Sequence, residues 1–218
     1  MVVYKSYEQP PICEREILRY AGCRQSDAAV AELLNDCLNE VQGRLQYKVC
    51  YHELPVVITN DICDFDAFRV QSGDLARNLQ GCHKVILLAA TIGIELDRLI
   101  AKYGHLSPSK ALMFQAIGTE RIEALCDEFC RDIKEAESCG TKPRFSPGYG
   151  DLPIDLQKEI FAFLSCEKHI GLTLNDSLLM SPSKSVTAFI GIGDDVDEQT
   201  ISKCQLCNKT ECSYRGVI

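Results

Sequence analysis

The sequence predicts an α+β fold in which a mixed or antiparallel sheet is flanked by helices. Its most regular strand signal is the continuous apolar run Lys84 to Thr91, which is typical of a strand covered by helices on both faces. A long amphipathic pattern begins at Ser107-Pro108 and runs to about Ser138, as expected for a helix that packs on the sheet. The β-branched and aromatic segment Ser185 to Ile192 predicts another strand. With 218 residues, 46% of them hydrophobic, the chain can bury a substantial core.

The first half of the chain is predicted to supply helices, then strands. A short helix spans Glu14 to Tyr20, and Asp27 caps a longer one to Leu45, in which apolar residues recur at helical spacing. Tyr47 to Leu54 is strand-like, and Val56 to Thr59 is expected to continue it beyond a kink at Pro55. The acidic segment 60–81 lacks the spacing of a calcium loop.

The second half alternates in the same way. After the strand that begins at Lys84, a turn at 91–93 leads into a helix through Tyr103, and its single glycine is too weak a signal for a dinucleotide site. A helix from Leu156 to about Cys166 and a short strand at 172–174 follow the loop at 144–153. We therefore expect one main domain over 1–198, in which the region 1–83 has fewer signals, and a cysteine-rich tail over 199–218.

Charge and composition narrow the classes of partner. The net charge of −8 and the absence of a basic cluster argue against a nucleic-acid surface, so proteins or small molecules are the expected partners. No long apolar run or signal-like N-terminus is present, which predicts a cytoplasmic protein. The thirteen cysteines are then expected to be reduced, with Cys37, Cys126 and Cys130 as small buried hydrophobes.

The loop Arg144 to Pro153 is the strongest candidate for a functional site. Pro147-Gly148 is the pair that a type II turn requires, and Pro153 suits the start of a helix whose partly positive end can face an anion. Arg144 is predicted to be an isolated cation beside this rigid backbone. On the preceding helix, the row Glu120, Glu123, Asp127 and Arg131 is either a solvated face or supplies a carboxylate to this loop.

At this loop the sequence resembles the reactivation domain of cobalamin-dependent methionine synthase. The family's S-adenosylmethionine motif has an arginine, a small residue two positions on, Pro-Gly-Tyr and a later proline. The matching residues are Arg144, Ser146, Pro147, Gly148, Tyr149 and Pro153. Agreement extends over about Lys84 to Ile192 and includes Glu120-Arg121 and the pattern Leu174, Ser177, Met180, Pro182, Ser185, Val186.

The resemblance implies a methionine synthase activation-domain-like fold that binds S-adenosylmethionine through Arg144, Ser146, Gly148 and Tyr149. It also implies that the domain supports reductive methylation of cobalamin carried by a partner, a methionine synthase or corrinoid protein without its own activation domain, with an electron donor. The protein would then be one component of a methyltransferase system that serves methionine biosynthesis. No cobalamin-, folate- or homocysteine-binding module is recognisable, so a stand-alone version is expected.

The sequence departs from the family pattern in three places. Gly150-Asp151-Leu152 replaces the family's small residue, cysteine and neighbours, and no later ligand tyrosine has a clear counterpart. An ungapped match puts Ala124 where the family has an acid on the long helix, so Glu123 or Glu120 is expected to substitute.

The tail carries a second candidate site, with Cys204, Cys207 and Cys212 at a spacing that suits zinc or an iron–sulfur cluster. Three thiolates are one short of a tetrahedral site, and Cys139, Cys166 or a partner residue can complete it. A reduced tail without function and a thiol redox role are the alternatives. They define a competing function, a non-catalytic metal- or iron–sulfur-binding module with a degenerate S-adenosylmethionine site.

Overall fold

The computed structural model describes residues 1–23, 27–137 and 140–193, and they form the predicted α+β fold. Its main sheet has five strands in the order β1-β2-β6-β10-β7, and all of their pairings are antiparallel. The long strands are β2 (Tyr47–Pro55), β6 (Lys84–Thr91) and β10 (Ser185–Gly193), while β1 (Val3–Tyr7) and β7 (Gly140–Thr141) form the edges. The strand β6, whose apolar run predicts burial on both faces, is therefore the central strand of this sheet.

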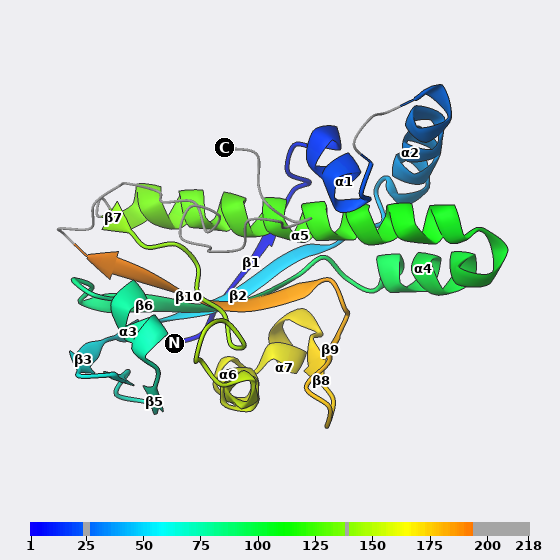
Figure 1. Cartoon of the computed structure of the whole chain (residues 1–218). Helices are drawn as coiled ribbons and strands as arrows, with labels where there is room; N and C mark the ends of the chain where they lie inside the picture. Colours follow the sequence, from blue (N-terminus) through cyan, green and yellow to red (C-terminus); the bar gives the residue numbers. More distant parts are fainter. Residues whose placement is uncertain (24–26, 138–139, 194–218) are drawn as a thin grey trace.

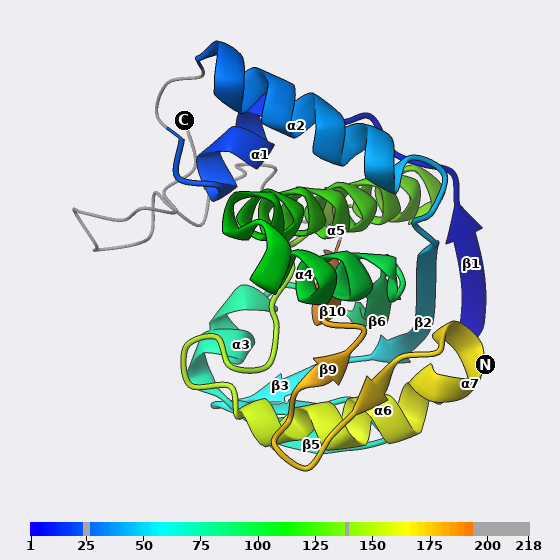
Figure 2. The same ribbon diagram turned by 90° about the vertical axis from the view of Figure 1, so that its right-hand side faces the viewer.

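One face of this sheet is covered by four helices in two layers. The helix α5 (Pro108–Glu137) lies along the strands beside α4 (Glu95–Leu106), and α1 (Glu14–Tyr20) and α2 (Ala28–Val41) lie outside them (Figures 1 and 2). Leu88 and Ala90 of β6, and Ala188 and Ile190 of β10, meet the apolar faces of these helices in one core. Burial of this apolar area supplies the main driving force for the layered packing.

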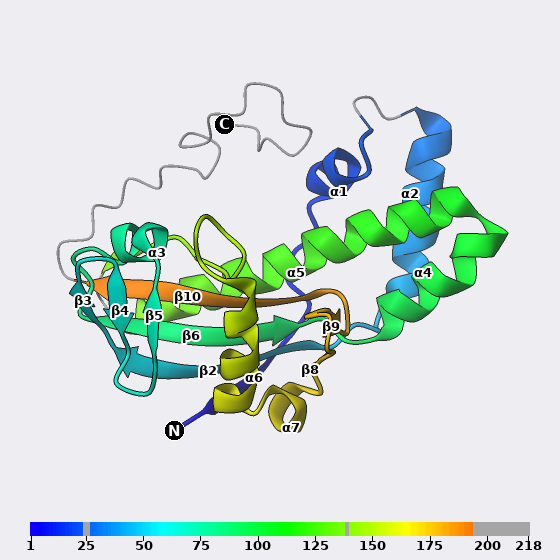
Figure 3. The same ribbon diagram turned by 60° about the horizontal axis from the view of Figure 1, so that its bottom comes forward.

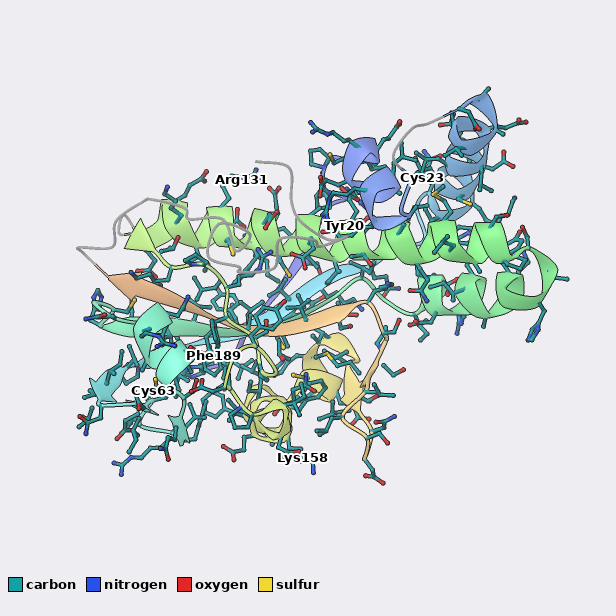
Figure 4. The ribbon with its side chains drawn as sticks, in the orientation of Figure 1. Tyr20, Cys23, Cys63, Arg131, Lys158 and Phe189 are labelled. Carbon is teal, nitrogen blue, oxygen red and sulfur yellow. The ribbon has the colours of Figure 1, made fainter. Side chains whose placement is uncertain are left out.

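The other face is covered by smaller elements. These are the helices α3 (Gly73–Asn78), α6 (Gln157–Leu164, preceded by a 3-10 turn Ile154–Leu156) and α7 (Cys166–Ile170), the sheet β3-β4-β5 (Val57–Thr59, Ile62–Asp64, Arg69–Gln71) and the pair β8-β9 (Thr173–Leu174, Met180–Ser181). Figure 3 shows α6 crossing the main sheet, with α3 and the small sheet at one end. Phe189 of β10 lies between the main sheet and α6 in a second core (Figure 4).

Two sequence-based boundaries were wrong. Residues 57–59 do not continue β2, because they pair with β4 in a separate sheet. Asp27 caps α2 as predicted, accepting a hydrogen bond from the Val30 amide at 2.9 Å, but the helix ends at Val41 rather than Leu45. The left-handed φ of +71° at Gly43 turns the chain there.

The edge strand β1 has no counterpart among the sequence predictions. It pairs with β2 from Val3↔Tyr51 to Tyr7↔Tyr47, and most of its side chains are exposed. Exposed strands lack the alternation of apolar and polar residues that marks a half-buried strand. The signal for a strand was therefore absent from this segment.

Candidate functional site

The loop after β7 has the turn that the sequence predicts. The Tyr149 amide donates to the Ser146 carbonyl at 3.0 Å, and Gly148 adopts a φ of +88°, as the third position of a type II turn requires. The Gly148 amide donates to the Leu152 carbonyl at 2.9 Å, which closes the loop on itself. Any residue with a Cβ at position 148 would have a strained backbone at this φ, and its Cβ would lie 3.1 Å from Ile154 Cδ1.

Both ends of this loop are attached to the rest of the fold. Phe145 and Phe189 of β10 exchange backbone hydrogen bonds of 2.9 and 2.8 Å. The Asp151 carboxylate accepts hydrogen bonds from the Gly73 and Asp74 amides at the start of α3, at 2.8 and 3.1 Å. The Asp151 amide in turn donates to the Asp74 carboxylate at 3.1 Å. Asp151, a departure from the family pattern, therefore fixes the loop to α3.

Arg144 begins the loop and is not the isolated cation that the sequence predicts. Its Nη2 donates to Glu123 Oε2 at 2.7 Å, and its Nη1 donates to Asp127 Oδ1 at 2.6 Å. Both carboxylates belong to α5, and Nη1 also lies 3.5 Å from Cys130 Sγ. The Arg144 side chain is only 13% exposed, whereas Glu123 and Asp127 are 42% and 69% exposed. A buried guanidinium is thus held by two carboxylates that reach solvent.

The surroundings of Arg144 keep it charged. Burial opposes the charge, but the carboxylates of Asp127 and Glu123 hold the pKa of Arg144 above its ordinary value. Burial also raises the pKa of the Cys126 thiol to about 12, so that thiol is neutral at pH 7. The site therefore offers a permanent cation, the Arg144 guanidinium, beside the carboxylates of Glu123 and Asp127 and the neutral, buried Cys126 thiol.

The row of charged residues on α5 divides between two roles. Glu123 and Asp127 face the loop, which supports Glu123 as the substitute for the family's acid. Glu120 was also predicted to lie on a solvated face or at this loop, and both interpretations are wrong, because it is buried beside Arg121. Its Oε1 accepts from the Cys13 amide at 2.9 Å, so it holds the N-terminal segment instead.

A small hollow of about 150 Å³ lies next to Arg144, where β10 has an open edge. Among the described residues, this edge pairs at Phe189 and over Gly191 to Gly193, where the Lys142 amide donates to the Gly191 carbonyl at 2.8 Å. The strand's first half therefore faces the loop. The hollow is lined by Glu123, Arg144, Ser146, Pro147, Tyr149, Gln157, Met180, Ser185, Val186 and Thr187. Four of the five predicted ligand-binding residues thus meet at one place, and the fifth, Gly148, shapes the turn beside it.

A second hollow of about 500 Å³ also has Arg144 in its lining. It runs between α1 and α5, where Tyr20 of α1 lies near α5 (Figure 4). Its lining includes the segment Pro10, Pro11 and Cys13 and the carboxylates of Glu16, Glu120, Glu123, Asp127 and Glu128. Arg144 and Glu123 line both hollows, so the two hollows adjoin at this ion pair.

Gln157 and Thr187 line the small hollow and were missed by sequence reasoning. A signal existed for Gln157, because it lies one helical turn before Ile160 on the buried side of α6, where an apolar residue is expected. Thr187 gave no such signal, since threonine is common in strands of every kind.

The cysteines predicted to bind metal, Cys204, Cys207 and Cys212, lie outside the described residues, as does Cys139. Cys166, the other candidate, is buried in the second core. Over residues 1–23, 27–137 and 140–193, no group of three or more His, Cys, Asp or Glu side chains is placed to hold a metal ion. None of the helices in those ranges is both long enough and apolar enough to span a membrane.

Comparison with known proteins identifies the family. The profile described as "Vitamin B12 dependent methionine synthase, activation domain" matches residues 75–209, well over half of the chain. The chain belongs to this family. The activation-domain chain is also similar in fold to the crystal structure of the MetH reactivation domain bound to AdoHcy, with a TM-score of 0.66 and 15% sequence identity. That similarity covers 89% of this chain and 79% of the other. No curated protein sequence matches the chain.

Proposed function

We propose that this activation-domain protein binds S-adenosylmethionine at Arg144, with one part of the ligand in the small hollow beside it. The observation that carries the proposal is the buried Arg144 guanidinium on a rigid Pro-Gly turn, paired with Glu123 at 2.7 Å. A methionine end presents a carboxylate and an ammonium group, which complement an arginine and a glutamate. The family membership and the AdoHcy in the MetH structure support the same ligand.

In the proposed role, the bound methyl donor serves a corrinoid cofactor that a partner protein carries. When bound, the partner's cobalamin would supply a reduced cobalt nucleophile, formed with one electron from a separate donor. That nucleophile would accept the methyl group as the sulfonium S–C bond breaks, leaving S-adenosylhomocysteine. Arg144 holds the ligand's carboxylate, and Glu123 its ammonium group. The turn at Ser146 to Tyr149 fixes the sulfonium relative to the protein surface, and the half-exposed Tyr149 lies at the rim facing the partner.

The proposal places the protein in the cytoplasm, with a methionine synthase or corrinoid protein as its partner. We expect wild-type protein to bind S-adenosylmethionine and S-adenosylhomocysteine in calorimetric titrations. Added to a methionine synthase that lacks its activation domain, together with a one-electron reductant, it should restore methylation of oxidised cobalamin. Binding without restoration would indicate the wrong partner, and no binding of either compound would exclude the proposed function.

We further propose that Cys204, Cys207 and Cys212 bind zinc or an iron–sulfur cluster, a proposal that rests on their spacing alone. A cluster could deliver the electron that the methyl donor cannot supply. Metal analysis and a visible spectrum of anaerobically purified protein should detect metal in the wild type and little in a Cys204→Ser/Cys207→Ser double variant. Equal, negligible metal in both would identify the tail as ordinary reduced cysteines.

A further inference from the structure

Two buried polar side chains in the lining of the small hollow each carry an oxygen without a hydrogen-bond partner. Gln157 of α6 is 5% exposed and Thr187 of β10 is 2% exposed. Within the described part of the chain, Gln157 Oε1 and Thr187 Oγ1 make no hydrogen bond, and both residues line the hollow beside Arg144. Since the great majority of buried polar groups are paired, two unpaired groups in one hollow require a physical explanation.

The free protein is less stable for having them. An unpaired buried oxygen has lost its hydration without gaining a partner, whereas an apolar side chain of the same shape would avoid that loss. The position of both residues is well determined by the fold. Gln157 is the first residue of α6, directly after the 3-10 turn that follows the candidate loop. Thr187 shares the face of β10 that carries Phe189, because side chains alternate along a strand. Both residues line the hollow, so a molecule that enters it meets their side chains, and rotation of those side chains can bring the buried oxygens to it.

The two groups define what that molecule must offer. A glutamine carboxamide has an acceptor and donors on one edge, and a threonine hydroxyl can donate or accept. Together they match a heterocycle that carries an amino donor beside a ring-nitrogen acceptor, which is the edge of adenine that glutamine pairs with elsewhere. The hollow, about 150 Å³, is smaller than the roughly 300 to 1,000 Å³ of complete small-molecule pockets. Its size suits one end of a ligand rather than the whole of it.

We propose that Gln157 and Thr187 select the 6-aminopurine ring of the bound nucleoside by hydrogen bonding to its amino group and an adjacent ring nitrogen. This inference rests on the proposed function, and it adds the residues that determine base specificity. Arg144 and Glu123, which line both hollows, hold the amino-acid end of the ligand where the two hollows adjoin. The unpaired oxygens then find their partners only when an adenine is present.

The test compares S-adenosylhomocysteine with S-inosylhomocysteine, in which an oxo group replaces the 6-amino group. Calorimetric titration of the wild type should show a preference for the adenosyl compound of about tenfold or more. Gln157→Met and Thr187→Val, each close in shape to the original residue, should weaken the adenosyl compound and reduce that preference. Thr187→Ser, which keeps the hydroxyl, should retain it.

Thermal unfolding of the free protein supplies a second readout. Both apolar variants should unfold at the wild-type temperature or above it, because they remove an unpaired buried group. Lys158→Met is the control, since Lys158 lies next to Gln157 in sequence but points away from the sheet (Figure 4) and does not line the hollow. It should leave the affinity and the preference unchanged.

The outcomes separate the two proposals. If the wild type binds both compounds equally, or if both apolar variants bind S-adenosylhomocysteine as tightly as the wild type, the base-specificity inference is overturned while the proposed function stands. If the wild type binds neither compound, the proposed function fails and the inference fails with it. Weaker binding accompanied by a lower unfolding temperature in both variants would also overturn the inference, because it would indicate damage to the fold.

Discussion

Replacing Arg144 by alanine should abolish most of the binding of S-adenosylmethionine. The guanidinium is buried, so its hydrogen bonds to a ligand carboxylate are charge-assisted and shielded from water. We expect a loss of about 2 to 4 kcal/mol, which corresponds to an affinity roughly 30- to 1,000-fold lower. Calorimetric titration of the wild type and Arg144→Ala with S-adenosylmethionine measures this difference.

Two further variants make the Arg144 result specific. Arg144→Lys should not restore affinity, since a lysine ammonium cannot grip a carboxylate with two parallel hydrogen bonds. Arg131→Ala removes the same charge from the rim of the neighbouring hollow, where Arg131 pairs with Glu128, and should bind as the wild type does. Equal affinity of the wild type and Arg144→Ala would contradict the assignment of Arg144 as the carboxylate-binding residue.

Replacing Arg121 by alanine should cause the largest loss of stability. The Arg121 side chain is 1% exposed, and its guanidinium contacts Glu120 and the carbonyls of Pro10 and Pro11, the latter two at 2.6 Å each. Removing it leaves the Glu120 carboxylate buried without its cation, which costs about 3 to 5 kcal/mol. The free energy of unfolding from urea denaturation should fall by that amount.

The control for Arg121 is Arg98→Ala. Arg98 forms an exposed ion pair with Glu95 on α4, and such pairs contribute about 0 to 1 kcal/mol. Arg121→Lys should recover only part of the stability, because a single ammonium cannot reach all of these acceptors with the same geometry. If Arg121→Ala unfolds at the same urea concentration as Arg98→Ala, then the buried cluster is not what attaches the N-terminal segment to α5.

The long periodic elements could be predicted from sequence because their burial is expressed in their residues. The strand Lys84–Thr91 is apolar on both faces, and α5 has a continuous apolar stripe, so their type and place follow from the pattern. The short strands β3, β4 and β5 are set by pairing between segments, which no local pattern encodes.

The candidate site divides in the same way. The turn at Pro147-Gly148 was predictable because proline and glycine determine their own backbone angles. The partners of Arg144 were not, because Glu123 and Asp127 lie 21 and 17 residues earlier in the chain and meet it only when α5 packs beside the loop. Glu120 looks like its neighbours in sequence, and only the course of the N-terminal segment removes it from solvent.

The pairing of Arg144 with two carboxylates affects how a ligand can enter the site. Arg144 is already paired with two carboxylates, so a ligand carboxylate must exchange with Asp127 or Glu123 rather than occupy a vacant cation. The displaced carboxylates lie close to solvent and can be rehydrated at little cost. Both hollows, of about 150 and 500 Å³, have Arg144 and Glu123 in their linings, so opening of this pair would let a ligand extend from one into the other. The segment Pro10 to Cys13, remote from the loop in sequence, lines the larger hollow and would then border the route by which the ligand enters.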